Sequence, residues 1–381
     1  MAKKYMIVGA GKMGRAIAHD LLNSPDTEGV TLCDRDTAAA DAAKERLPDP
    51  RVTCIAIDAS DVNALHRKMV GFDCAIGAAS YEFNLAMTKA AVAARIHYCD
   101  LGGNNDVVDK QFMLDAAAKN AGIRVLPDCG IAPGAVSVLS RLALERVPDA
   151  ERLQIRVGGL PQHPQGPLKY ALVFSARGLV SNYVEPTEIL WEGKRELVPS
   201  LGGLEYQHFA TLGRLEAAYT SGGSSTLTKT YEGRLKHLDY KTLRWEGHWS
   251  TVKLLRDLGM LAESATAVDG SPLNPREFLI QWLDATLPKN QPDLLVLRVC
   301  ATNAARHGVT LDLIDRMDPA TGHSAMQRTT GYSASIIAQM LASGEIAATG
   351  VLKHEEAVPP DRFIEEWRKR GFALTESAVT P

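Results

Sequence analysis

The chain has 381 residues, of which 45% are hydrophobic and 23% charged, and its formal net charge at pH 7 is -3. This length exceeds what one hydrophobic core usually serves, so we expect two domains. The small net charge gives no electrostatic reason to expect nucleic acid or a membrane surface as a partner. Because no apolar run approaches the roughly 18 to 20 residues that span a bilayer, and Met1-Ala2-Lys3-Lys4 leads straight into a strand without a signal peptide, we expect a cytoplasmic protein.

The sulfur and imidazole side chains argue against disulfides and metals. The six cysteines are scattered, form no CxxC pair and mostly lie in or beside apolar runs (Cys33, Cys54, Cys74, Cys99, Cys129 and Cys300). We therefore predict buried, reduced thiols. The ten histidines are isolated and show no metal-ligand spacing, so a metal site is not expected.

The first structural unit of the sequence is a strand, a tight glycine turn and a helix. The apolar run Tyr5 to Val8 breaks into Gly9, Gly11 and Gly14, after which apolar residues recur at helical spacing. In a dinucleotide-binding turn the first glycine permits the bend, the second leaves room for a pyrophosphate, and the third lets the helix approach the strand. The helix N-terminus attracts the anion.

A second apolar run, Val30 to Cys33, ends in Asp34. At this place a carboxylate grips both ribose hydroxyls and repels a 2′-phosphate, so the sequence predicts NAD rather than NADP. Arg35, the next residue, is the feature that could soften this preference.

Strands and helices continue to alternate after Asp34. Further strands are predicted at Val52 to Ile57, Phe72 to Ala78, His97 to Leu101 and Ile123 to Leu126. Six strands suit a doubly wound α/β (Rossmann) fold, in which ligands collect at the carboxyl ends of the strands. The predicted cofactor-binding residues are Gly9, Gly11, Lys12, Met13, Gly14, Asp34, Asp58, Ala78, Ala79, Asp100, Leu101 and Gly102. For Asp58, a helix N-cap is an equally good interpretation.

The pattern changes near Cys129, where a helix opens and meander strands follow. We predict an NAD-binding domain at 1–128, a mixed-sheet α+β domain for substrate binding and oligomerisation at 129–330, and C-terminal helices at 331–381 that return to the first domain. Strands of the second domain are predicted at Arg152 to Val157, Tyr170 to Phe174, Ile189 to Trp191, Leu215 to Tyr219 and Leu294 to Thr302. The glycine-serine stretch Thr220 to Thr226 is predicted to be shaped for close approach.

Candidate chemical groups gather in the run Tyr240 to His248. Arg244 offers a bidentate fork for a carboxylate, and Lys241 is a second cation or, if desolvated, an acid-base group. Thr242 and Tyr170 are further substrate-binding candidates. The same run also fits a solvated edge strand.

Two more candidates lie at strand ends of the first domain. Tyr81 follows the fourth strand, near the expected nicotinamide, where its ring either acts in catalysis or only covers the cofactor. Asp128 ends the sixth strand, where it either orients a substrate amine or caps the residues after it.

Several motifs together resemble the saccharopine dehydrogenase-like family, and within it the lysine 6-dehydrogenase branch. They are GAGKMG, DLGG from Asp100, PDCGIAPG from Pro127, VGGLP from Val157, TSGGSSTL from Thr220 and YKTLRWEGH from Tyr240. The resemblance covers nearly the whole chain. It implies a two-domain homo-oligomer that oxidises the ε-amine of L-lysine with NAD to an imine, which hydrolyses to the semialdehyde and ammonia.

One position departs from related saccharopine reductases, which usually carry Asp in a Gly-Leu-Asp-Pro-Gly turn where this chain has Ala132. The alanine favours the lysine-oxidising branch and leaves the acid-base residue unassigned. Two alternatives stay open: a reductase of saccharopine or carboxynorspermidine type that joins or splits a secondary amine with NAD(P)H, and a non-catalytic NAD-binding module.

Overall fold

The computed structural model describes residues 2–381, which form two compact units. Of these residues, the first unit contains 2–142 and Gln327–Gly371, and the second contains Ala143–Met326 and Phe372–Pro381. The segment 129–142, which the sequence analysis placed in the second domain, thus belongs to the first unit, because most of helix α7 (Ala135–Arg146) packs there.

The first unit is built on a parallel sheet of seven strands in the order β17-β6-β5-β4-β1-β2-β3. Its strands are β1 (Lys3–Val8), β2 (Thr27–Asp34), β3 (Val52–Ala56), β4 (Cys74–Gly77), β5 (His97–Asp100), β6 (Arg124–Leu126) and β17 (Gly350–Val351). The predicted doubly wound fold is confirmed. The seventh strand comes from the last third of the chain, where a two-residue strand gives no periodicity that a sequence could reveal.

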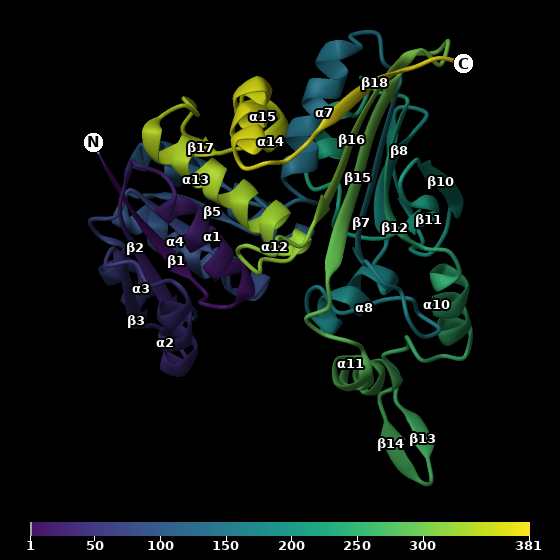
Figure 1. The fold of residues 1–381 in the computed structure, drawn as a ribbon, viewed down its shortest axis with the longest axis horizontal. Coiled ribbons are helices and arrows are strands. Elements are labelled where there is room, and N and C mark those ends of the chain that lie inside the picture. The colour runs from purple at the N-terminus through teal and green to yellow at the C-terminus, as the bar shows by residue number, and fades with distance from the viewer. Residues whose placement is uncertain (1) are drawn as a thin grey trace. The chain divides into compact units, whose positions relative to one another are not determined.

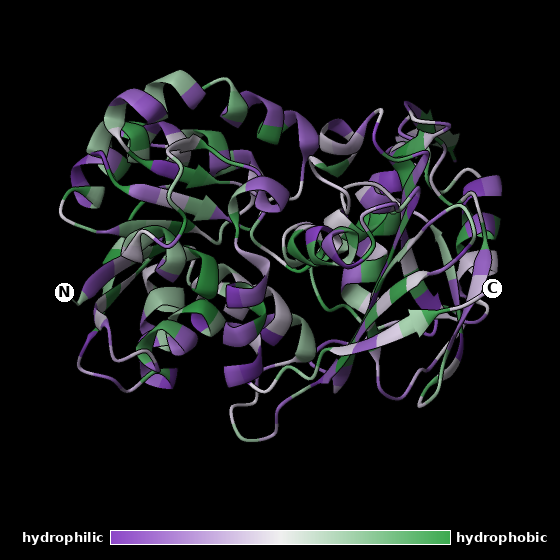
Figure 2. Cartoon of the chain, turned by 90° about the horizontal axis from the view of Figure 1, so that it is seen from above, coloured by the Kyte–Doolittle hydropathy of each residue, from purple (hydrophilic) through white to green (hydrophobic). Residues whose placement is uncertain are grey.

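Helices cover this sheet (Figure 1). The helices of the first unit are α1 (Lys12–Leu22), α2 (Thr37–Arg46), α3 (Val62–Met69), the 3-10 helix η1 (Tyr81–Phe83), α4 (Asn84–Ala94), α5 (Asn105–Phe112), α6 (Asp115–Ala121), most of α7, the π-helix η2 (Arg328–Tyr332), α13 (Ser333–Ser343), α14 (His354–Ala357) and α15 (Pro360–Lys369). In Figure 2 the strands of this sheet are mostly green and the helices carry purple stripes, as expected for apolar faces turned to a core.

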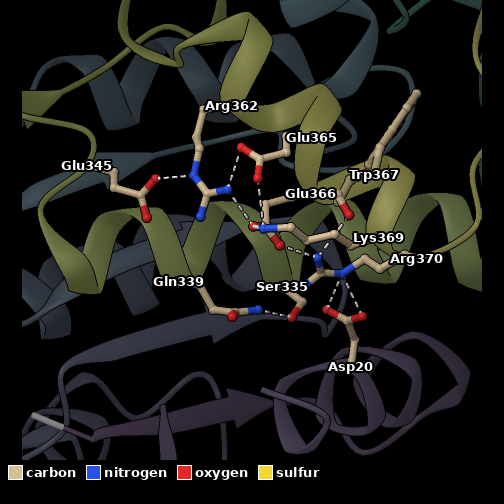
Figure 3. Close-up of polar contacts among 11 residues, drawn as sticks. Asp20, Ser335, Gln339, Glu345, Arg362, Glu365, Glu366, Trp367, Lys369 and Arg370 are labelled. Atoms are coloured by element: carbon tan, nitrogen blue, oxygen red, sulfur yellow. Dashed lines mark hydrogen bonds and ion pairs between the residues drawn. The ribbon is translucent and has the colours of Figure 1, made fainter. Parts of the chain in front are cut away.

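The C-terminal helix α15 is held to α1 by an ion pair that Figure 3 draws. Phe363, Ile364 and Trp367 form its buried face. The Arg370 guanidinium then reaches the buried carboxylate of Asp20 on α1, with Nε 2.7 Å from Oδ1. The helix that begins at the glycine turn is thereby tied to a segment 350 residues away.

The second unit is built on a mixed sheet of nine strands, with the path β10-β11-β12-β7-β15-β16-β18 and β8 and β9 attached to β12. Its strands are β7 (Arg152–Pro161), β8 (Thr187–Trp191), β9 (Lys194–Val198), β10 (Glu205–Phe209), β11 (Gly213–Tyr219), β12 (His237–Trp245), β15 (Asp293–Thr302), β16 (Gly308–Arg316) and β18 (Thr375–Val379). Strands β12 and β7 are parallel and the other pairs antiparallel, so the predicted mixed sheet is confirmed.

The helices of the second unit are α8 (Ala176–Val184), α9 (Leu227–Tyr231), α10 (His248–Asp257), α11 (Pro275–Thr286) and α12 (Ala325–Gln327), and a separate hairpin joins β13 (Thr266–Val268) to β14 (Ser271–Leu273). Helix α11 begins at Pro275, because Asn274 caps its first turn and Pro275 suits the first helical position.

Three expectations about the second unit need correction. Residues 170–174 form no strand: only Leu172 makes an isolated bridge, to Lys289. The run is a loop that is buried from Tyr170 to Leu172 and exposed at Phe174. The run from Tyr240 is not a solvated edge strand, since β12 lies between β11 and β7. The last segment of the chain does not all return to the first unit, because β18 pairs with β16.

All six cysteines are free thiols, and four of them are buried. The prediction of burial is wrong for Cys54 and Cys300, which are partly exposed. Among the described residues, no helix has both the length and the apolar character needed to cross a bilayer.

Candidate functional site

The glycine turn after β1 has the geometry that a pyrophosphate requires. A Cβ at Gly14 would lie 1.9 Å from the Gly9 carbonyl oxygen, so only glycine allows α1 to approach this closely. Gly9 has a φ of +113°, which favours glycine. At Gly11, in contrast, a Cβ would meet nothing within 4 Å, so the space beside this backbone is open.

The N-terminus of α1 borders this open space. Gly11 is its N-cap and provides no side-chain acceptor, so the first turn presents backbone N–H groups to the turn. Lys12 is exposed and Met13 half-buried in that turn. These residues fit the diphosphate of a dinucleotide.

Asp34 ends β2 beside the turn. Its Oδ2 accepts a hydrogen bond from the Ala10 amide at 2.9 Å, and its Oδ1 accepts one from the Asp36 amide at 3.1 Å. These two bonds orient the carboxylate at the place where a dinucleotide fold holds the ribose diol.

The neighbouring strand ends contribute small or half-buried residues. Ala78 and Ala79 follow β4, and a Cβ at Gly9 would lie 2.5 Å from the Ala78 carbonyl oxygen. Tyr81 begins η1, and a Cβ at Gly103 would lie 3.4 Å from its ring. Leu101 follows β5, and its amide donates to the Gly77 carbonyl.

Asp100 and Asp128 shape the loops after β5 and β6. The buried Asp100 carboxylate accepts hydrogen bonds from the backbone amides of Gly102 (2.8 Å) and Asp128 (3.2 Å). It also accepts one from the side-chain amide of Gln111 (2.7 Å). Burial raises the pKa of Asp100 to about 6. The Asp100 side chain therefore holds the two loops together through hydrogen bonds in the protein interior. Asp128 is also buried, with a φ of +66°, and a Cβ at Gly102 would collide with its Oδ1.

Asp58 is not the N-cap of the following helix, and its contact with the cofactor stays a prediction. Its Oδ1 accepts from the amide and hydroxyl of Ser60, whereas the N-cap of the following helix α3 is Asp61. The Asp58 side chain is exposed at the end of β3, where these hydrogen bonds lower its pKa.

In the second unit, strand alternation separates the two cations that the sequence placed together. Residues two apart in a strand share a face, so Tyr240, Thr242 and Arg244 lie on one face of β12 and Lys241 lies on the other. Arg244 and Lys241 consequently cannot grip one carboxylate together.

Lys241 belongs to a closed group of ion pairs. Its Nζ lies 2.5 Å from Oε2 of Glu205, and the same carboxylate pairs with Arg156. Arg156 also contacts Asp239, at 2.9 Å. The charges of two cations and two carboxylates thus balance, and the Lys241 ammonium is already paired with a carboxylate of the protein.

Arg244 has different surroundings, made of aromatic rings. Its side chain is 4% exposed, and its guanidinium carbon lies 4.7 Å from the Tyr170 ring centroid and 5.8 Å from that of Trp249. Glu216 stands opposite Arg244 on β11 but accepts from the Trp249 amide at 2.6 Å. Three lysine or arginine side chains are buried in residues 2–381: Arg156 and Lys241 pair with carboxylates, and Arg244 does not.

Two buried donors beside one another have no acceptor. They are the Nε–H of Arg244 and the hydroxyl of Tyr170. A buried donor without a partner costs free energy, so such groups mark a place that an acceptor-bearing ligand can complete. The sequence predicted both residues as substrate ligands.

Thr242 lies on the same face and is covered by the glycine-serine loop. Its hydroxyl is 2.6 Å from that of Thr220. A Cβ at Gly223 would lie 2.3 Å from the Tyr240 ring, which confirms that this stretch is shaped for close approach.

Sequence reasoning missed Tyr183 and singled out His248 only as part of a polar run. The Tyr183 hydroxyl lies 2.9 Å from His248 Nε2, and both side chains contact Arg244 or its aromatic neighbours. Tyr183 sits on the amphipathic helix α8, where the sequence gives no reason to separate it from other core residues.

A small apolar cavity of about 10 Å³, lined in part by Tyr170, Tyr183 and His248, lies next to these rings. It has room for about one water molecule. Within the described part of the chain, no group of three or more His, Cys, Asp or Glu side chains could hold a metal ion.

Comparison with known proteins covers both units. Residues 5–126 match the saccharopine dehydrogenase NADP binding domain, and residues 130–372 match the saccharopine dehydrogenase C-terminal domain. The chain is 26% identical over 301 residues to a saccharopine dehydrogenase (NADP(+), L-glutamate-forming) of Saccharomyces cerevisiae, which covers 75% of this chain and 64% of the yeast protein. It is 24% identical to carboxyaminopropylagmatine dehydrogenase of Synechocystis sp., which covers 99% of this chain and 98% of that protein.

The fold comparison agrees. The apo structure of saccharopine dehydrogenase (L-Glu forming) from Saccharomyces cerevisiae superposes with a TM-score of 0.83 at 20% identity and covers 100% of both chains. A homospermidine synthase from Legionella pneumophila in complex with NAD has a TM-score of 0.74 at 12% identity, covering 99% of this chain and 91% of the other. The two matched domains, the glycine turn and the parallel sheet that carries it together show that the chain belongs to the saccharopine dehydrogenase family.

Proposed function

We propose that this protein is an NAD-dependent dehydrogenase that deaminates L-lysine oxidatively at its ε-amine. In the proposed reaction, lysine, NAD⁺ and water yield the 6-semialdehyde, NADH, ammonium and one proton. When bound, a nicotinamide cofactor would accept the hydride from the ε-carbon. Gly9, Gly11 and Gly14 would hold its diphosphate and Asp34 its ribose.

The observation that carries the proposal is the buried Arg244 guanidinium without a carboxylate partner. Its free Nε–H and the free Tyr170 hydroxyl are donors, and the α-carboxylate of an amino acid is an acceptor for both. A guanidinium binds a carboxylate through a planar fork, which fixes the direction in which the rest of the substrate extends. Thr242, on the same face of β12, can contact the substrate near this anchor.

The number of available cations favours a substrate with one carboxylate. Among the buried lysine and arginine side chains of residues 2–381, only Arg244 lacks a carboxylate partner, and the substrate lysine carries one carboxylate. Ala132 in the Gly-Ile-Ala-Pro-Gly turn points the same way by resemblance to the lysine-oxidising branch.

Hydride transfer from the ε-carbon requires a neutral amine, so the site has to lower the pKa of the ε-ammonium or remove its proton. Tyr81 and Asp128, at the ends of β4 and β6, are the candidates for contact with the reacting end of the substrate. Lys241 is a weaker candidate for acid-base catalysis, since Glu205 holds its ammonium.

A reductase that joins or splits a secondary amine is the second candidate. It is favoured by the full-length similarity to carboxyaminopropylagmatine dehydrogenase and to carboxynorspermidine synthase of Vibrio cholerae, to which the chain is 24% identical over 98% of its length.

We also propose that the protein is a homo-oligomer, that NAD is its preferred cofactor and that it is located in the cytoplasm.

One assay separates the candidates. Purified protein is incubated with NAD or NADP and a panel of amino acids and diamines, and reduced cofactor and ammonia are measured in parallel. We expect lysine to give equal amounts of both products, with NAD bound more tightly than NADP because Asp34 repels a 2′-phosphate. Reduced cofactor without ammonia, obtained only with saccharopine-type secondary amines, would establish the second candidate instead.

A further inference from the structure

A chain of hydrogen bonds runs from a backbone carbonyl to the Arg244 guanidinium. His248 Nδ1 lies 2.7 Å from the Leu168 carbonyl oxygen, and His248 Nε2 lies 2.9 Å from the Tyr183 hydroxyl. The Tyr183 oxygen in turn accepts a hydrogen bond from Arg244. All three side chains are buried, with exposed fractions of 1% for His248, 5% for Tyr183 and 4% for Arg244.

The backbone carbonyl of Leu168, at the start of this chain, decides which group donates in each hydrogen bond. A carbonyl oxygen only accepts, so Nδ1 of His248 carries the proton. A neutral imidazole then has a lone pair on Nε2, and Tyr183 must donate its hydroxyl proton to it. Burial lowers the pKa of His248 to about 3, which agrees with a neutral ring. The Tyr183 hydroxyl therefore has only lone pairs left for Arg244.

Contacts with neighbouring rings and with one backbone carbonyl limit the rotation of the Arg244 guanidinium. Its Nη1 donates to the Leu243 carbonyl at 2.9 Å, one face lies against the Tyr170 ring, and another of its N–H groups donates to Tyr183. The Trp249 side chain, which contacts Tyr183 edge-on at 5.5 Å, is fixed by its Nε1 donating to the Glu216 carbonyl. With these contacts made, the Nε–H is the donor left without a partner.

We propose that Tyr183 and His248 are positioning residues that orient Arg244 to bind the substrate carboxylate. His248 fixes the polarity of the Tyr183 hydroxyl, and Tyr183 fixes the plane of the guanidinium. Without His248 as its acceptor, the Tyr183 proton could turn toward Arg244, and the guanidinium would lose an acceptor and gain a competing donor. This inference rests on the proposed function, since it names what prepares the proposed carboxylate site.

The test compares the kinetics of Tyr183→Phe and the wild type with two substrates, lysine and cadaverine. Cadaverine has the two amines of lysine but lacks its carboxylate. We expect KM for lysine to rise about 10-fold or more, as for loss of one hydrogen bond to a charged group. The kcat for lysine and the kinetics with cadaverine should change much less. His248→Leu should act in the same direction, and His248→Gln, which keeps a donor for Leu168 and an acceptor for Tyr183, should restore most of the lysine affinity.

Tyr231→Phe is the matched control. This tyrosine is 4% exposed in the same unit, but its ring stacks with Arg234 rather than Arg244. Equal losses with lysine and cadaverine in Tyr183→Phe, together with a lower melting temperature, would mean that Tyr183 serves only the fold. Unchanged kinetics would overturn the inference as well.

A second measurement keeps the inference separate from the proposed function. With ¹⁵N-labelled arginine, the Nε–H signal of Arg244 is identified by its disappearance in Arg244→Lys. In the wild type we expect a single sharp signal protected from solvent exchange, and in Tyr183→Phe a broadened or rapidly exchanging one. If no amine is oxidised but the signal behaves in this way, the proposed reaction fails and the positioning role stands. An unchanged signal in Tyr183→Phe rejects the positioning role.

Discussion

At the scale of single residues, Lys241 and Arg244 show how a strand separates chemically similar side chains. They are three positions apart, and because side chains alternate across a strand they face opposite sides of β12. One side holds carboxylates that neutralise Lys241, and the other holds aromatic rings that leave Arg244 without a counter-ion. The two cations thus have different roles, although both stand in one polar run of the sequence.

Replacing Arg244 by Lys should keep the charge but lose the planar fork. A charge-assisted hydrogen bond contributes about 1.5 to 3 kcal/mol, so KM for lysine should rise about 10- to 150-fold with a smaller change in kcat. Steady-state kinetics with lysine and cadaverine measure this. Equal losses with both substrates would show that Arg244 serves the fold or the chemistry rather than the carboxylate.

Gly11 and Gly14 should respond in opposite ways to a side chain. Gly11→Val should leave the melting temperature nearly unchanged, because its backbone is extended (φ -67°, ψ -165°) and its Cβ meets no neighbour, but should abolish NAD binding by filling the space for the diphosphate. Gly14→Ala should destabilise the fold, since its Cβ would collide with the Gly9 carbonyl. Calorimetric NAD titration and thermal unfolding check both variants. Normal NAD binding by Gly11→Val would place the cofactor elsewhere.

At the scale of elements, the C-terminal helix α15 completes the first unit. Its Arg370 holds Asp20 of α1 with Nε, while its Nη1 contacts Glu366 one turn earlier (Figure 3). Asp20 is 4% exposed, and burial raises its pKa, so its charge depends on this partner. The helix whose N-terminus lies at the cofactor turn is therefore anchored at its other end by the last helix of the chain.

Breaking this anchor should be costly because it leaves a buried charge unpaired. Arg370→Met should lower the free energy of unfolding of the first unit by about 3 to 5 kcal/mol. The control is Lys4→Met, whose ion pair with Glu28 is about half exposed on both sides (50% and 52%) and should contribute less than about 1 kcal/mol. Thermal or urea unfolding compares the two. Equal effects would mean that the Asp20 pair adds no more than a surface pair.

At the scale of the whole molecule, each unit buries a neutral histidine. His248 lies in the second unit, and His354 in the first unit donates to the Pro127 carbonyl at 2.9 Å. Burial lowers the pKa of His354 to about 4. The unfolded chain takes up a proton near pH 6.5, whereas the folded protein resists it, so this contribution to stability is present above pH 6.5 and is lost as pH falls toward 4.

The variant His354→Gln isolates this effect, since its amide can still donate to Pro127. Between pH 7 and pH 5, the wild type should lose about 2 kcal/mol more unfolding free energy than the variant. Asp100, whose raised pKa of about 6 acts in the opposite direction, is present in both proteins and cancels in the difference. Urea unfolding at the two pH values measures this difference. A parallel loss in both proteins would contradict a buried neutral His354.

The sequence alone determined those features that depend on local chemistry or on periodicity. Gly9, Gly11, Gly14 and Asp34 are recognisable because a tight turn, a close helix approach and a carboxylate after the second strand each demand a residue type at a set spacing. The parallel sheet follows from alternating apolar runs, and the start of α11 follows from Asn274 and Pro275. The choice of Arg244 and Tyr170 as substrate ligands also came from the sequence and stays a prediction.

Only the tertiary structure decided which of these polar groups are already satisfied. The partner of Lys241, Glu205, is 36 residues away, and the acceptor chain behind Arg244 joins Leu168, Tyr183 and His248 from separate segments. The seventh strand β17 and the return of β18 to the second sheet depend likewise on partners far along the chain. Pairing of this kind is set by packing between distant segments, which a local pattern of residues does not encode.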